Sequence, residues 1–283
     1  MTILSVGSLT KLYPAFTLDR VSFSLESGSI MGFIGRNGAG KTTTLKSMLG
    51  LVHPDGGSVA MFGTDFFTHQ AECRQRLGVV FGEANYYPTK RLRDIASVTK
   101  RFYGSWDDSA YQKYMTRFEL DETKKISELS SGMRVKFALA LALSHDAKLF
   151  LLDEPTSGLD PVSRDELIGI FRELVSDGDR SILFSTHIIS DLEKCADSIT
   201  YIHAGRILAS EDITVFQDGY RAVSGTSEDL TPELKSRVIG LREHKFGWEG
   251  MIRTEDQRRF DGMDISRIGL EEIMVHMERE GQK

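Results

Sequence analysis

The chain has 283 residues, 40% of them hydrophobic, which is enough to bury the core of one large domain or of two modest ones. Its net charge of -6 and pI near 5.7 argue against a surface that neutralises a phosphodiester backbone, so we expect no nucleic acid partner. The two cysteines, Cys73 and Cys195, lie far apart and outside any C-x-x-C pair, which indicates neither a disulfide framework nor a zinc site and fits a reducing cytoplasm.

The apolar runs of the sequence are short. FALALAL at 137–143 and LFLL at 149–152 fall well below the ~20 residues that a membrane-spanning helix needs. The N-terminal MTILSVGSLTKLY lacks the charged start and apolar centre of a secretory signal. We therefore expect a cytoplasmic chain that does not cross a membrane unaided.

The first half of the chain begins with strands and a glycine-rich loop. Residues 1–28 mix β-formers with turn residues and predict short strands. SIMGFIG at 29–35 predicts a buried strand that runs into the loop, and KTTTLKSMLGL at 41–51 predicts a helix. Two later runs, KLFLLDEP at 148–155 and RSILFSTH at 180–187, are continuous and apolar, as in parallel strands covered on both faces. An α/β fold follows.

The remaining segments predict two further parts. Residues from about 88 to 147 carry helical patterns and form a mainly helical insert within a first domain at 1–218. Residues 219–283 are strand-like and punctuated by glycine, and they end in a helix with Leu270, Ile273, Met274 and Met277 on one face. We interpret them as a small α+β appendage. Their role is open, and packing as a lid or dimer support is favoured over ligand sensing.

The glycine-rich loop matches the pattern G-x-x-x-x-G-K-T from Gly35 to Thr42. In this pattern backbone N–H groups turn inward around phosphates, Lys41 reaches the terminal ones, and the Thr42 hydroxyl suits Mg²⁺. The alternative is a turn that caps a helix and binds nothing.

Polar residues follow the two later apolar strands. Asp153 and Glu154 lie at the C-terminal end of one, where Asp153 suits a Mg²⁺ shell and Glu154 a general base for an attacking water. His187 ends the other and suits a sensor of the terminal phosphate. Taken singly, each of these residues has a simpler interpretation. The two acids could be a solvated strand end or a helix cap, and the histidine could be an ordinary surface or packed residue.

The stretch LSSGM at 129–133 places small residues with free N–H groups at the start of a helix, as a second phosphate-binding surface would. Alone it is also what an N-cap and turn look like. In combination, however, the sequence over about residues 2–217 resembles the ATP-binding subunits of ABC transporters. The motifs that carry the resemblance, in family order, are GRNGAGKTT (Walker A), LSSGM (signature), LFLLDE (Walker B), SGLD (D-loop) and STH (H-loop).

The resemblance implies an ABC-type P-loop NTPase fold, with an N-terminal antiparallel β part, a parallel core sheet and a helical subdomain. It implies an ATPase with ATP and Mg²⁺ as cofactors, in which Tyr13 stacks on adenine. It also implies a head-to-tail dimer in which Ser130 and Gly132 contact the partner's γ-phosphate and Asp160 lies at the seam. The nucleotide-contacting residues implied within one chain are Tyr13, Gly35, Asn37, Gly38, Ala39, Gly40, Lys41, Thr42 and Thr43.

In this family such subunits drive a separate membrane permease, so the resemblance implies a peripheral location on the inner face of the cell membrane. Exporters of bacterial drug and antibiotic-resistance systems are the most similar type. The second ATP-binding subunit is another copy or a paralogue. Cargo and direction are not determined by the sequence.

Two motifs depart from the family pattern. The signature usually reads LSGGQ, whereas this chain has Ser131 and Met133 at its third and fifth positions. The Q-loop normally contains a glutamine, whereas RLGVVFGEANYYP offers Gly82 and Glu83. We hypothesise that Glu83 supplies an oxygen to metal or water, and a solvated loop acid is the equal alternative.

Two other functions stay open at this point. One is a soluble ABC ATPase of repair, chromosome or translation type, although such relatives usually add coiled coils, zinc modules or a second cassette to the same chain. The other is a regulatory nucleotide binder that rarely hydrolyses, which only the altered Q-loop favours.

Overall fold

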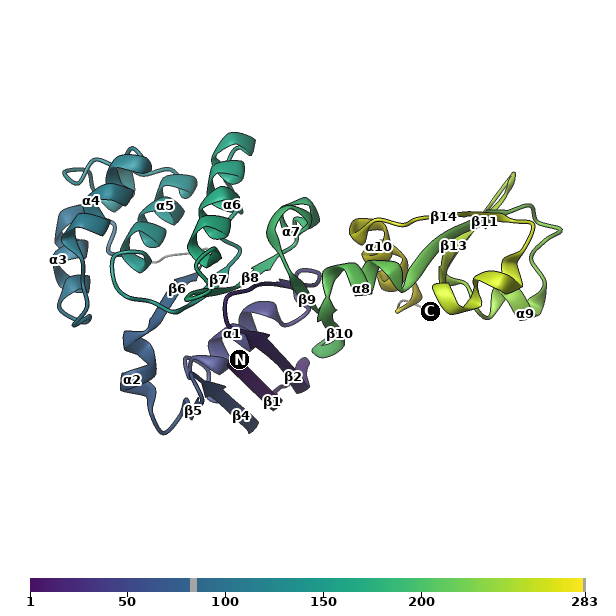
Figure 1. Cartoon of the computed structure of the whole chain (residues 1–283), viewed down its shortest axis with the longest axis horizontal. Coiled ribbons are helices and arrows are strands. Elements are labelled where there is room, and N and C mark those ends of the chain that lie inside the picture. The colour runs from purple at the N-terminus through teal and green to yellow at the C-terminus, as the bar shows by residue number, and fades with distance from the viewer. Residues whose placement is uncertain (82–85, 282–283) are drawn as a thin grey trace. The chain divides into compact units, whose positions relative to one another are not determined.

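The computed structural model describes residues 1–81 and 86–281 and divides the chain into two compact units, Met1–Ser210 and Glu211–Lys283 (Figure 1).

An antiparallel sheet opens the first unit, with strand order β2-β1-β4-β5. Its strands are β1 (Thr2–Tyr13), β2 (Phe16–Glu26), β4 (Gly56–Met61) and β5 (Thr64–Asp65). The prediction of short strands was wrong for β1 and β2, which run for 12 and 11 residues. Their register shifts between Val6 and Leu9, and Ser8 takes a φ of 49°, as at a bulge. The bulge lets the strand continue through residues that resemble a turn in the sequence.

A six-stranded sheet forms the centre of the first unit, in the order β10-β9-β3-β8-β7-β6. The pairings of β9 with β3, β3 with β8, β8 with β7 and β7 with β6 are all parallel, as predicted. All residues of β3, β7 and β8 are buried, which explains their continuous apolar sequences. The strands are β3 (Ile30–Ile34), β6 (Leu77–Phe81), β7 (Leu149–Asp153), β8 (Ser181–Thr186), β9 (Ser198–His203) and β10 (Arg206–Asp212).

Helices of the first unit fall into a core set and an insert. The core set is α1 (Lys41–Met48), α2 (Gln70–Gln75), α6 (Pro161–Val175) and α7 (Ile189–Cys195). The insert, predicted as helical, holds α3 (Leu92–Lys100), α4 (Asp108–Arg117), the 3₁₀ turn Ile126–Glu128 and α5 (Ser131–Ala142). No helix in the described part of the chain is both long and apolar enough to span a bilayer.

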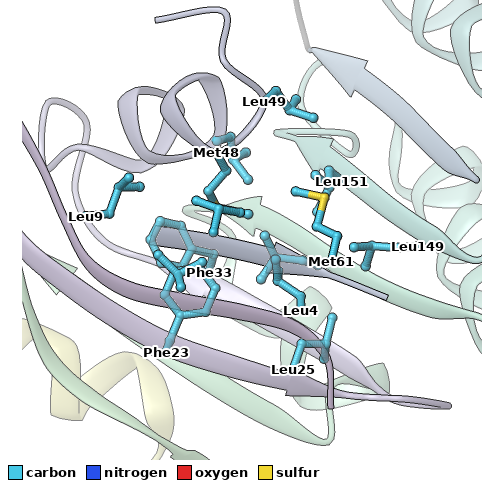
Figure 2. Packing of buried hydrophobic residues seen from close by; sticks show 14 of the residues in the cluster. Leu4, Leu9, Phe23, Leu25, Phe33, Met48, Leu49, Met61, Leu149 and Leu151 are labelled. Atoms are coloured by element: carbon cyan, nitrogen blue, oxygen red, sulfur yellow. The ribbon is translucent and has the colours of Figure 1, made fainter. Parts of the chain in front are cut away.

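The main core of the first unit lies between its two sheets and around α1 (Figure 2). Leu4 and Phe23 contribute from the antiparallel sheet, Phe33 and Leu151 from the central one, and Met48 from α1. All five are at least 94% buried. Because α1 starts at the glycine-rich loop, this packing anchors the loop at the end of β3.

The second unit has a sheet in the order β12-β13-β11-β14, antiparallel throughout. Its elements are α8 (Ile213–Asp218), β11 (Tyr220–Gly225), α9 (Pro232–Lys235), β12 (Ile239–His244), β13 (Gly247–Arg253), the 3₁₀ helix Thr254–Phe260, β14 (Asp264–Ser266) and α10 (Leu270–Glu280). From β11 to β14, a helical turn follows the first strand and the third, which is the β-α-β-β-α-β order of a ferredoxin-like fold. The sequence predicted the α+β class but not this topology.

Separate apolar contacts hold the two faces of this sheet. Trp248 and Phe260 form a core on one face together with Val223. Side chains alternate along a strand, so Ala222 and Ser224 lie on the opposite face, beside α10. The predicted apolar face of α10 is confirmed, with Leu270, Ile273 and Met274 buried and Met277 half-buried.

Candidate nucleotide-binding site

The loop between β3 and α1 is shaped by glycines with positive φ angles. Gly38 has a φ of 82° and Gly40 a φ of 114°, conformations that side chains other than glycine rarely adopt. A Cβ on Gly40 would also lie 2.9 Å from the ring of Phe16. Gly40 is the N-cap of α1, so the positive end of the helix dipole faces the loop. Such an end attracts phosphate groups.

Lys41 is folded back into the loop. Its Nζ donates to the carbonyl oxygen of Gly35 at 2.7 Å, lies 3.4 Å from that of Arg36, and lies 3.3 Å from Oε1 of Glu154. The side chain is buried. Its ammonium therefore lies where the loop and the end of β7 meet.

Thr42 and Asp153 are joined directly. The Thr42 hydroxyl donates to Oδ2 of Asp153 at 2.8 Å, and Ser185 donates to Oδ1 of the same carboxylate at 2.5 Å. Asp153 is buried at the end of β7. These three oxygen-bearing side chains are the kind of ligands that Mg²⁺ prefers.

Glu154 occupies a strained position in front of Lys41. Its φ is 52°, an uncommon value for a residue other than glycine, and its N–H donates to the carbonyl oxygen and the Oγ of Ser185. Oε2 of its carboxylate is 2.7 Å from Nδ1 of His187. The carboxylate thus lies between the Lys41 ammonium and the His187 ring.

A pocket of about 460 Å³ lies in front of these groups. The predicted residues that line it are Asn37, Gly38, Gly40, Lys41, Thr42, Thr43, Glu154 and His187. Sequence reasoning missed Phe16, Arg36, Ser157 and Ser185, of which all but Ser185 line the pocket. Ser185 carried a signal, because it stands two positions before His187 in the run RSILFSTH that predicts a strand, and alternate residues of a strand share a face. Phe16 carried no such signal in the sequence, since it reaches the pocket from β2.

Three predicted contact residues lie outside the lining. Gly35 takes part through its carbonyl oxygen, which accepts from Lys41. Ala39 is buried in the core beside α1, and its carbonyl oxygen accepts from Gly205. Tyr13 ends β1, opposite Phe16 across the strand pair, and its ring lies 5.7 Å from Nζ of Lys11. Its contact with adenine stays a prediction.

The signature and D-loop residues also lie away from the pocket of their own chain. Ser130 is exposed and caps α5, accepting from the N–H of Met133 at 3.2 Å. Gly132 packs so closely on Leu159 that an added Cβ would lie 3.0 Å from its side chain. Asp160 caps α6, and hydrogen bonds to Ser163 lower the pKa of its carboxyl. Their contacts with a partner's nucleotide stay predictions.

The predicted metal contact of Glu83 falls outside the described residues. Within the described ranges, no group of three or more histidine, cysteine or acidic side chains could hold a metal ion. The metal contacts predicted for Thr42 and Asp153, which are hydrogen-bonded to each other, stay predictions. Cys73 and Cys195 are free thiols.

Comparisons with known proteins agree with this geometry. The ABC transporter family model matches residues 18–157. The bacitracin transport ATP-binding protein BcrA of Bacillus licheniformis is 34% identical over 259 residues, which cover 89% of this chain and 85% of that protein. The Nod factor export ATP-binding protein I of Burkholderia lata is 38% identical over 197 residues, covering 68% of this chain and 64% of that protein.

Solved structures give the same answer for the fold. The structure of an ATP-binding subunit of an ABC transporter superposes with a TM-score of 0.69 at 26% identity, covering 76% of this chain and 92% of the other. A dimeric ATP-binding cassette with ADP and phosphate bound has a TM-score of 0.66 at 21% identity. With the phosphate loop, the Thr42–Asp153 pair and the Glu154–His187 pair in one pocket, the chain belongs to the ABC transporter family and is one of its ATP-binding, ATP-hydrolysing subunits.

Proposed function

We propose that this chain drives export through a separately encoded membrane permease, with Glu154 as the general base of ATP hydrolysis. The observation that carries the proposal is the convergence of Lys41, Glu154 and His187, from three separate segments, on one pocket behind a phosphate loop. The names of the bacitracin transport and Nod factor export relatives support export.

The substrate phosphates fit the start of α1, where Lys41 and the helix dipole supply positive charge. Thr42 and Asp153 would hold Mg²⁺, since both offer oxygen atoms within hydrogen-bond distance of each other. When bound, this ion neutralises charge on the outer phosphates.

Glu154 is bound in this structure by two groups that also suit phosphate oxygens, the Lys41 ammonium and the His187 ring. When ATP enters, Lys41 and His187 release the Glu154 carboxylate and bind phosphate oxygens instead. The Glu154 carboxylate is then free to accept a proton from water. The oxygen of that water bonds to the γ-phosphorus while the bond to the bridging oxygen breaks, which releases ADP and phosphate. His187 holds the γ-phosphate in line for this displacement.

Each pocket is completed by a second ATP-binding subunit, either another copy or a paralogue. Ser130 is exposed at the start of α5 and is absent from the pocket lining, so it is available to a neighbouring chain. In a head-to-tail pair Ser130 and Gly132 contact the nucleotide of the partner, and Asp160 lies at the seam.

The hydrolysis assignment is tested with Glu154→Gln, which keeps the shape of the side chain and removes the base. We expect turnover to fall by at least about a hundredfold, while ATP binding persists and a dimer accumulates on gel filtration. Glu173→Gln, which changes an exposed acid on α6, is the control and should hydrolyse ATP normally. A Glu154→Gln chain that stays monomeric in saturating ATP and turns over at the normal rate would refute the assignment.

We propose that the permease docks on the helical insert. Tyr86 packs on Phe137 and Tyr103 stacks on His145, so these rings belong to the insert's own core. By contrast, Val98 in the last turn of α3 is 55% exposed, and Phe102, two residues past the end of that helix, is 70% exposed. We assign docking to this exposed apolar pair.

Docking is tested by co-expression with the permease and salt-washed membrane fractions. Phe102→Ser with Val98→Ser should release the chain from the membrane, whereas Phe246→Ser, which removes an 83% exposed ring from the second unit, should not. Equal retention of both variants would contradict docking through α3. Binding to protein-free lipid vesicles would indicate a direct lipid anchor instead.

A further inference from the structure

Behind the catalytic pocket lies a cluster of buried polar atoms without hydrogen bonds. Among the described residues, Oγ1 of Thr156, Nε of Arg164 and Oδ2 of Asp191 are all enclosed, and none of the three atoms has a hydrogen bond. Asp191 is only 2% exposed and Thr156 is fully buried. A buried polar group without a hydrogen bond destabilises the fold, so three of them require an explanation.

The cluster connects two segments that contribute to the site. Thr156 stands two residues after Glu154, and Arg164 lies near the start of α6, where its Nη2 donates to the carbonyl oxygen of Leu159 at 3.5 Å. Asp191 is in the first turn of α7, four residues after His187. The residues on either side of the D-loop and the helix that follows His187 therefore meet at these three side chains.

The cluster is close to a bonded arrangement. Nε of Arg164 is 3.9 Å from Oδ2 of Asp191, too far for a hydrogen bond but within reach of one after a shift of about 1 Å. A charge-assisted bond between them would replace two unpaired atoms. Burial raises the pKa of the Asp191 carboxyl, and Thr156 and Arg164 oppose that rise, so the charge of Asp191 depends on these neighbours.

We propose that Thr156, Arg164 and Asp191 form a positioning cluster that sets the place of the His187 ring, which lies against Glu154 in this structure and on the γ-phosphate once ATP is bound. The cluster completes its hydrogen bonds when the D-loop shifts on dimer closure. This proposal rests on the proposed function, since it assigns to the cluster the coupling of Asp160 at the seam to His187 in the pocket. α7 is a helix, so a displacement of Asp191 is passed on to the residues just before it. The Nδ1–Oε2 distance between His187 and Glu154, 2.7 Å, is short enough that a small displacement alters their contact.

The main test is Asp191→Asn, which keeps the shape of the side chain and removes its charge. We expect kcat for ATP hydrolysis to fall by about tenfold or more, while KM stays within about twofold, because the nucleotide contacts are untouched. Asp165→Asn is the matched control, since Asp165 also joins α6 to α7, through Lys194 at 2.6 Å, but on the exposed surface. It should leave kcat unchanged.

A double-mutant cycle with His187→Ala distinguishes an action of Asp191 through His187 from a purely structural role of Asp191. If Asp191 acts through His187, adding Asp191→Asn to His187→Ala lowers kcat little further. Losses that simply add would overturn the proposal, as would a normal kcat in Asp191→Asn. If Asp191→Asn does not fold, the decision rests on Thr156→Ser, which keeps the hydroxyl and should keep the rate, against Thr156→Val, which should not.

The failure of this proposal is distinguishable from that of the proposed function. An unmodified chain that does not hydrolyse ATP with its partner subunits overturns both. An active chain whose kcat is unaffected by Asp191→Asn and by Thr156→Val overturns the cluster alone.

Discussion

At the scale of single residues, the site is a set of opposite charges held in contact. The Lys41 ammonium is buried, and its partners are two carbonyl oxygens and the Glu154 carboxylate. A phosphate has to compete with these partners. A phosphate group in the loop would interact with the positive N-terminal end of α1 as well as with the Lys41 ammonium, and this second interaction favours phosphate over the Glu154 carboxylate.

Lys41→Ala removes a charge-assisted contact of the kind worth about 1.5–3 kcal/mol. We expect the Kd for MgATP to rise by at least about tenfold in calorimetric titrations. Lys46→Ala, which changes a lysine at the other end of the same helix, is the control and should bind normally. An unchanged affinity in Lys41→Ala would show that the loop does not hold the phosphates.

The residues that sequence reasoning found and missed differ in how they reach the pocket. Lys41, Glu154 and His187 all line the pocket, and local spacing fixes the place of each. Glu154 and His187 follow directly on β7 and β8, and Lys41 ends the loop that follows β3. Their roles stay predictions. Phe16 reaches the pocket only through the pairing of β1 with β2, which no local pattern encodes. The roles of Ser130, Gly132 and Asp160 depend on a second chain and stay predictions.

At the scale of elements, the helical insert is joined to the central sheet through His145. The ring follows α5, donates from Nε2 to the carbonyl oxygen of Leu77 in β6 at 2.9 Å, and stacks on Tyr103 with 3.7 Å between ring centroids. It is buried, and that burial lowers its pKa below the ordinary 6.5. The neutral ring is therefore part of the folded structure.

This pKa makes stability depend on pH in a defined direction. Below about pH 6.5 the unfolded chain binds a proton at His145 and the folded chain does not, so the free energy of unfolding falls as the pH falls towards the folded pKa. In urea titrations at about pH 7.5 and about pH 5.5, His145→Gln should show a smaller difference than the unmodified chain. His53→Gln, at an exposed histidine, should not. An identical pH dependence in both variants would contradict the assignment.

The sequence predicted the type of element where a strand is completely buried. It did not predict how long the strands are. β3, β7 and β8 are buried throughout and mainly apolar because both faces are covered, and their sequences indicated this. β1 and β2 extend past residues that resemble turns because a bulge at Ser8 and the positive φ of Arg20 keep the ladder together. Whether a strand can continue through such residues depends on its pairing with the neighbouring strand, which a local sequence pattern does not contain.

At the scale of the whole molecule, the chain consists of two units, each with its own apolar core. The sequence places a change of texture near residue 219, whereas contacts divide the chain at Ser210 and Glu211. The difference arises because the sequence of α8 does not show to which unit the helix belongs. In the structure α8 packs on β11, with Phe216 against Tyr220, and so belongs to the second unit. We propose that the second unit unfolds independently of the first.

The chain's two tryptophans, Trp106 and Trp248, belong to different units, so Trp106→Phe leaves the buried Trp248 as a reporter of the second unit. MgATP at about 100 times its Kd should stabilise the first unit by about 2.7 kcal/mol, visible in circular dichroism. The Trp248 fluorescence transition in urea should stay where it is. A shift of equal size in both signals would mean that the chain unfolds as one cooperative body.

The strand order of the second unit also bears on how it is synthesised. β11 is the first strand of this unit to leave the ribosome, yet in the finished sheet it lies between β13 and β14. One of its edges therefore stays open until β13 has been made, and the other until residues up to Ser266 have been made. An unpaired strand is a site of association with other chains during that interval. β14 finally covers the second edge with only three residues, pairing with Ala222, Val223 and Ser224. A nascent chain that stops before Ser266 therefore exposes its central strand, which makes completion of this short segment the step that ends the risk of aggregation.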